Sequence, residues 1–134
     1  MDLDRLTLLR RVLNFAVFVH QRFAIALLII TVILGLWGTY EYGRFRRLSG
    51  GFRSTYLLMI GLTALQGLAG ILAYLAGGHP REVVHIVYGI FAIVFLPGVY
   101  LYTSRASKER EALLLALSCW IVGIAYARGW FTGQ

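Results

Sequence analysis

Four long stretches without a single Asp, Glu, Lys or Arg constrain this chain most. They cover residues 23–40, 54–78, 83–104 and 112–127, and the charged residues gather between them. A helix of about 20 apolar residues crosses the hydrocarbon core of a bilayer. Backbone polar groups in lipid must pair within their own segment, which favours helices over irregular structure. Each stretch therefore predicts a membrane-spanning helix.

The fold class follows from the order of these stretches. We predict an all-α integral membrane protein, a four-helix transmembrane bundle with short loops, forming a single membrane domain over residues 1–134. The expected spans are about 20–41, 54–77, 82–104 and 109–129. Residues 1–19 carry Leu6, Leu9 and Leu13 at helical spacing. They predict either an amphipathic helix along the membrane surface or an outward extension of the first span.

Composition and charge exclude several classes of protein. Hydrophobic residues make up 59% of the chain and charged residues only 14%, which leaves too little polar surface for a soluble domain of this size. The net charge is +7, but the arginines flank apolar stretches, so we expect the lipid bilayer as partner and no nucleic acid. The single cysteine, Cys119, allows no internal disulfide and no zinc cluster.

The distribution of cations favours one orientation slightly. Seven lie in the two links that join spans one to two and three to four: Arg44, Arg46, Arg47, Arg53, Arg105, Lys108 and Arg110. Six lie on the other side: Arg5, Arg10, Arg11, Arg22, Arg81 and Arg128. Since cytoplasmic loops carry an excess of Lys and Arg, we expect both termini on the same, outward side. We expect the membrane to be the cell membrane of a prokaryote.

Two histidines within the spans are candidate metal ligands. His20 opens span one and His85 lies near the start of span three. The two spans run in the same direction, because the span between them returns the chain, so both imidazoles lie at similar depth. Ionisable residues inside a membrane mark functional sites. Gly67, Gly70 and Gly89 on spans two and three would let a flat porphyrin approach the helices, and haem iron accepts axial histidine.

Three arginines lie on the same membrane side as the histidines. Arg22 follows His20 by two residues, Arg128 ends span four, and Arg81 precedes His85 by four, which would place it on the same helix face nearer to water. They could pair with the two propionates of a haem through charge-assisted hydrogen bonds. The alternative readings are structural: an interfacial histidine, arginines that anchor the helix ends, and small residues that serve helix packing.

Three segments resemble the haem A synthase family. They are VHQRFA, LQGLAGILAYL and HPREVVHIVYGIFA, which together cover roughly residues 17–100. That family is built from two repeated four-helix halves, in which histidines of the second and fourth helices can ligate haem. The resemblance implies that His20 and His85 take the ligand positions in one such half.

The sequence also departs from that family. Gln21 stands between the histidine and the arginine, no acidic residue occurs at positions 15–19, and the chain has one cysteine rather than an extracytoplasmic pair. The resemblance extends over one such half only. The resemblance therefore implies retained haem binding, for electron transfer or as a structural haem. The sequence leaves an independent catalytic activity open. A haem A synthase-like oxidation is possible, but the chain lacks the glutamate of that family's motif.

Two functions remain open from the sequence. The first is a membrane b-type cytochrome with one haem b, whose iron lies between His20 and His85 and exchanges electrons with a quinol or another redox membrane protein. The second is a cofactor-free accessory subunit of a respiratory or photosynthetic membrane complex. A haem-modifying enzyme or a transporter is disfavoured, because the four uncharged stretches inside the spans contain no Asp, Glu or Lys. Assembly as a homo-oligomer stays open.

Overall fold

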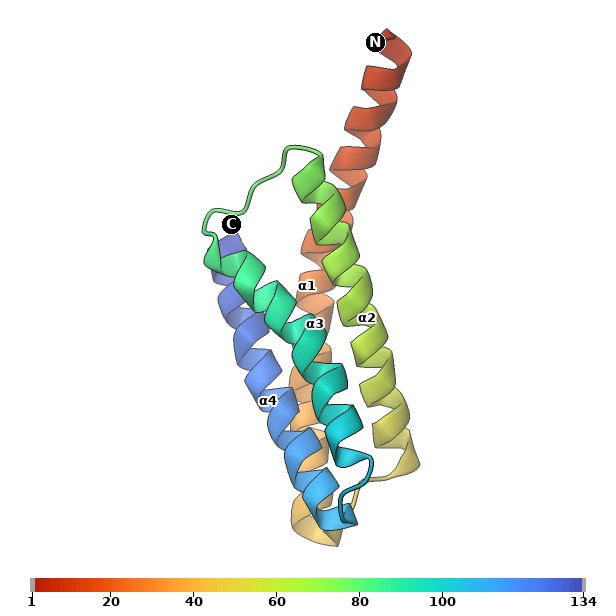
Figure 1. Cartoon of the computed structure of the whole chain (residues 1–134), viewed down its shortest axis with the longest axis vertical. Coiled ribbons are helices and arrows are strands. Elements are labelled where there is room, and N and C mark those ends of the chain that lie inside the picture. The colour runs from red at the N-terminus through yellow and green to blue at the C-terminus, as the bar shows by residue number, and fades with distance from the viewer. Residues whose placement is uncertain (1, 134) are drawn as a thin grey trace.

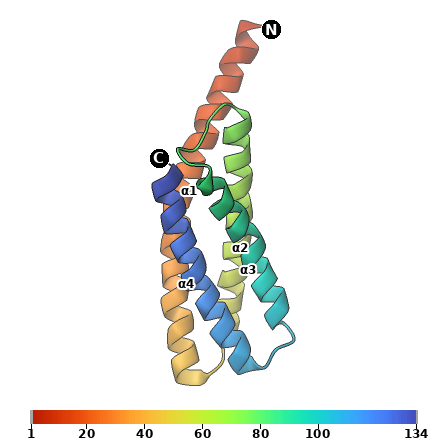
Figure 2. The same cartoon turned by 60° about the vertical axis from the view of Figure 1, so that its left-hand side comes forward.

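The computed structural model of the chain describes residues 2–133, which form an antiparallel bundle of four helices (Figures 1 and 2). The helices are α1 (Leu3–Phe45), α2 (Gly50–Leu75), α3 (Val84–Thr103) and α4 (Lys108–Gly133). Each is long and apolar enough to cross a membrane. Both ends of the chain lie at the same end of the bundle (Figure 1). The prediction of an all-α four-helix bundle with membrane-spanning helices is confirmed.

Helix α1 is much longer than a bilayer requires. Its 43 residues rise about 64 Å at 1.5 Å per residue, about twice the hydrocarbon thickness. The first turns of α1 continue the helix without a break and project beyond the other three helices (Figure 1), and residues 3–12 are all exposed. Side chains such as Leu3 and Phe15 are exposed there, and the first fully buried residue of α1 is Leu27. Only the second part of α1 therefore belongs to the packed bundle.

The helix ends have local causes in the sequence. The Ser49 and Ser107 hydroxyls each accept a hydrogen bond from the backbone N–H three residues on, at 3.1 and 3.3 Å, and so cap α2 and α4. Arg46 takes a left-handed conformation and closes α1. Helix α3 begins at Val84, so Arg81 lies in the non-helical link before it. The helical spacing that the sequence suggested between Arg81 and His85 is therefore wrong.

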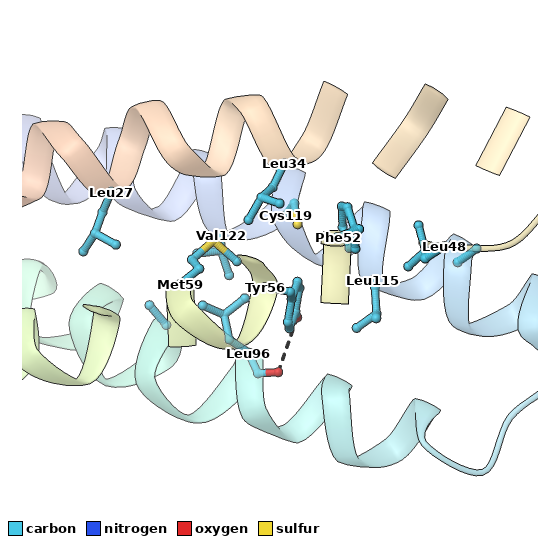
Figure 3. Close-up of a cluster of buried hydrophobic side chains, with 12 residues drawn as sticks. Leu27, Leu34, Leu48, Phe52, Tyr56, Met59, Leu96, Leu115, Cys119 and Val122 are labelled. Carbon is cyan, nitrogen blue, oxygen red and sulfur yellow. Dashed lines mark hydrogen bonds between the residues drawn. The ribbon is translucent and has the colours of Figure 1, made fainter. Parts of the chain in front are cut away.

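The core joins all four helices in the half of the bundle that contains the links 46–49 and 104–107 (Figure 3). Helix α1 packs against α2 and α4, α3 packs against α4, and the contact between α2 and α3 is the smallest. The Tyr56 hydroxyl lies 2.8 Å from Ser118 Oγ and donates to the Leu96 carbonyl at 3.3 Å, so a buried polar group links three helices. The core residues are Leu27, Leu34, Leu48, Phe52, Tyr56, Met59, Ala92, Leu96, Ala112, Leu115, Cys119 and Val122.

The outer surface of the bundle is strongly apolar. Leu36, Leu58, Val94 and Ile124, one from each helix, are all more than half exposed. A soluble monomer rarely leaves so much apolar surface in contact with water. These side chains suit contact with lipid, so the surface agrees with helices that cross a membrane.

Candidate functional site

A cavity of about 580 Å³ lies in the other half of the bundle, toward the chain ends. All four helices and the link between α2 and α3 contribute to its walls. Cofactor and ligand sites commonly have volumes of about 300–1,000 Å³ and mostly apolar walls. Five residues selected from the sequence line this cavity: His20, Gly67, Gly70, His85 and Gly89.

The two candidate histidines meet in this cavity. His20 comes from α1 and His85 is the second residue of α3, yet their ring centroids are only 5.8 Å apart. The ring planes are inclined by 75° to each other. Both side chains are half-buried. The fold therefore brings together two imidazoles that are 65 residues apart in the sequence.

Each histidine is hydrogen-bonded through Nδ1 to a backbone carbonyl. The His20 Nδ1 lies 3.2 Å from the Gln66 carbonyl oxygen, and the His85 Nδ1 lies 2.8 Å from the Gly129 carbonyl oxygen. Since a carbonyl only accepts, Nδ1 carries the proton, and in a neutral imidazole Nε2 then keeps its lone pair. Among residues 2–133, neither Nε2 has a hydrogen-bond partner. Histidines that bind metals are oriented in this way.

Glycines on α2 and α4 give the imidazoles room. A Cβ at Gly70 would lie 3.0 Å from Cε1 of His20, and a Cβ at Gly133 would lie 2.7 Å from Cε1 of His85. Both distances are shorter than normal carbon–carbon contacts, so any larger residue would displace the rings. Gly89 differs, because a Cβ there would meet no atom within 4 Å. The cavity is therefore tight around the histidines and open beside Gly89.

Gln66 holds α1 and α2 together beside His20. Its Nε2 donates to the His20 carbonyl oxygen at 2.8 Å, while its own backbone carbonyl accepts from the His20 ring. Its Oε1 is buried and has no partner among the described residues. A buried acceptor without a donor is rare in native structures and points to a missing ligand or water. Gln66 also lines the cavity, so this unpartnered oxygen belongs to the same site.

The three arginines predicted to bind carboxylates do not line the cavity. Arg22 is exposed and its guanidinium lies 5.4 Å from the centre of the Phe18 ring. Arg81 is exposed in the link before α3. Arg128 is exposed beside Tyr88, which does line the cavity. Of the three, only Arg128 is linked to the site, through one intervening side chain, and the pairing of these arginines with propionates stays a prediction.

Sequence reasoning missed several residues of the site. Gly129 and Gly133 on α4 contact His85, and the hydroxyls of Thr63 and Tyr126, which are hydrogen-bonded to each other, lie in the cavity wall. The spacing of four residues between the two glycines was the available signal. His79 also lines the cavity but is exposed in the link.

Fold and site together define a class: a four-helix membrane bundle with a paired-histidine cavity. Among residues 2–133, no third His, Cys, Asp or Glu joins His20 and His85 to make a site of three or more such ligands. Comparisons with models of protein families, with curated proteins and with solved structures give no match to this chain. The functional argument therefore depends on the site itself.

Proposed function

We propose that the chain binds one haem b between α1 and α3, with His20 and His85 as axial ligands, and serves as a membrane b-type cytochrome or a structural haem protein. We also propose that the chain is related to one half of haem A synthase. The observation that carries it is the pair of neighbouring imidazoles, each bound through Nδ1 to a carbonyl and each with an Nε2 that has no hydrogen-bond partner among residues 2–133.

The number of protein ligands favours haem over a bare metal ion. A structural zinc site needs four protein ligands, whereas a porphyrin supplies four nitrogens and leaves only axial positions to the protein. Imidazole nitrogens bind metals at about 2.0–2.1 Å, so two ligands in line place their nitrogens about 4 Å apart. Ring centres lie farther apart than these nitrogens. The separation of 5.8 Å between the centroids is close to the ring-centre distance that this geometry requires but shorter, so the two rings would move apart slightly to admit an iron between them.

The residues around the histidines would set the properties of the bound group. When bound, haem iron would supply a one-electron couple. The carbonyls of Gln66 and Gly129 hold the imidazoles in one tautomer and increase their basicity. The mostly apolar walls keep water out, which influences the reduction potential. We propose a quinol or another membrane redox protein as the electron partner.

Absorption spectroscopy of the chain purified in detergent, with haem added, tests the proposal. We expect a Soret band and split reduced bands in the wild type, and loss or severe weakening of haem retention in His20→Ala and in His85→Ala. His79→Ala is the matched control, since His79 is exposed in the link and its ring lies 5.0 Å from the Tyr74 ring, and it should keep the spectrum. Haem retained unchanged in both ligand variants would refute the ligand pair. A wild type that stays colourless would instead favour the cofactor-free accessory subunit.

The location proposed for the chain is a prokaryotic cell membrane, with both termini outward. Its support is the concentration of seven cations in the two links at the opposite end of the bundle. In a Cys119→Ser background, a cysteine placed at Asp2 should react with an impermeant thiol reagent added to whole cells, and a cysteine placed at Arg105 should not. The reverse pattern of labelling would overturn this orientation.

A further inference from the structure

A second cavity, of about 440 Å³, lies at the end of the bundle opposite the histidines, where α1 ends and α2 and α4 begin. Phe45 and Leu48 form its apolar wall, and the cations Arg47, Arg53 and Lys108 lie around it. The links at this end, residues 41–53 and 104–111, carry seven Lys or Arg and three Glu. The proposed haem site plays no part in this region.

The Glu41 carboxylate at this cavity already accepts hydrogen bonds from protein donors. Glu41 is only 8% exposed. Its Oε1 accepts from the Trp37 indole N–H at 2.8 Å, and its Oε2 accepts from the Ser49 backbone N–H at 2.9 Å. Both carboxylate oxygens are therefore satisfied within the fold. Glu41 therefore organises the link between α1 and α2 through both of its carboxylate oxygens.

One cation is also committed to the fold. The Arg53 Nε and Nη2 atoms donate to the two carboxylate oxygens of Glu111 at 2.7 and 3.0 Å. This bidentate pair joins α2 to α4, and its members are 27% and 11% exposed. Because both carboxylate oxygens of Glu111 accept from Arg53, this bidentate ion pair is a strong interaction. Arg53 therefore supports the wall of the cavity and does not provide a free charge.

Two cations at the cavity are exposed and have no close ion pair within the described part of the chain. Arg47 is exposed and has no ion pair among residues 2–133. Lys108 has only a 3.9 Å approach to Glu111, whose oxygens already bind Arg53, and its side chain is 72% exposed. The first turns of α2 and α4 begin at this cavity and add the positive ends of two helix dipoles. A ligand here would meet two exposed cations next to an apolar wall.

We propose that this cavity binds the phosphate group of an anionic phospholipid. The cavity lies just outside the uncharged stretches 23–40 and 112–127, at the level where lipid phosphates meet water. Arg47 and Lys108 donate to the phosphate oxygens, and Phe45, which is 54% exposed, contacts the apolar part of the same lipid. Free inorganic phosphate offers the same charge without that apolar part, so a lipid uses more of the site.

Native mass spectrometry of the detergent-purified full chain tests this proposal. We expect one dioleoyl phosphatidylglycerol per chain, bound about tenfold or more tightly than dioleoyl phosphatidylcholine. The double variant Arg47→Gln/Lys108→Gln should bind phosphatidylglycerol at least about tenfold more weakly, because it loses two charge-assisted hydrogen bonds. The matched control is Arg105→Gln/Arg110→Gln, which removes the same charge from the same end without touching the cavity lining. It should bind the lipid like the wild type.

Each result decides one part of the proposal. Equal lipid affinity in the wild type and the Arg47→Gln/Lys108→Gln variant would overturn the site, and so would an equal loss in the control, which would show general charge attraction. Inorganic phosphate that displaces the lipid at similar concentration would keep the phosphate chemistry but overturn the lipid as its source. Circular dichroism checks that each variant stays helical. If the double variant does not fold, Arg47→Gln alone replaces it, since that side chain is exposed.

Discussion

Replacing Gly70 by alanine should weaken haem binding by moving His20. A Cβ at this position would lie 3.0 Å from Cε1 and 3.3 Å from Nδ1 of the His20 ring. The ring cannot simply rotate away, because its Nδ1 is bonded to the Gln66 carbonyl on the same helix, at 3.2 Å. The imidazole must therefore shift by a few tenths of an ångström from its place opposite His85.

The expected size of this effect follows from two opposing contributions to stability. Alanine in place of glycine inside a helix stabilises by about 1 kcal/mol, while crowding a packed site costs about 1–3 kcal/mol. The net loss of folding stability should therefore lie between about 0 and 2 kcal/mol. Haem affinity depends directly on the position of the ligand, so we expect a loss of about tenfold or more, which corresponds to about 1.4 kcal/mol.

A haem titration followed by absorption measures this affinity, and denaturation in a harsh detergent measures the stability. Gly61→Ala is the matched control, since Gly61 lies on the same helix and a Cβ there would meet no atom within 4 Å. That variant should bind haem like the wild type. Equal haem affinity in Gly70→Ala and Gly61→Ala would show that His20 does not need its present position.

Three further changes test other parts of the structure. Gly89→Leu should weaken haem binding about tenfold or more, because the leucine would fill the open part of the cavity and reduce the free energy of haem binding by about 1–3 kcal/mol. An unchanged haem titration would place the porphyrin ring elsewhere. Gly38→Ala should destabilise the bundle by up to about 2 kcal/mol in detergent denaturation, after the gain in helix propensity, since its Cβ would approach side chains of α2 and α4 at 2.9 and 3.1 Å, whereas Gly43→Ala on the same helix meets nothing. Arg53→Ala should cost about 1–3 kcal/mol, because it leaves Glu111 largely buried without its bidentate partner; unchanged stability in the same assay would contradict the importance of that pair.

The sequence predicted the helices better than their ends. Uncharged stretches indicate which residues lie in the hydrocarbon core, so the four helices could be predicted from the sequence. Helix α2 nevertheless begins at Gly50, before Arg53, because Ser49 caps it and Glu111 pairs with the arginine. The charge that seemed to end the span is neutralised by a contact 58 residues away. Hydropathy holds no information about such a partner.

Depth in the membrane explains which site residues could be predicted from the sequence. His20, His85, Gly67, Gly70 and Gly89 lie at levels that the span boundaries define, and they line one cavity. The rotation of each helix about its own axis is fixed only by packing, so the sequence did not show which face of α4 meets His85. The carbonyl of Gly129 was missed for that reason. Arg81 was placed on a helix face because the expected helix began before Val84.

The most direct test of the paired-histidine site is electron paramagnetic resonance of the oxidised, haem-loaded chain. Ligation by both His20 and His85 predicts a low-spin, six-coordinate ferric signal, which should become high-spin when either histidine is replaced by alanine. A high-spin signal in the wild type, or a low-spin signal that survives either replacement, would contradict the account.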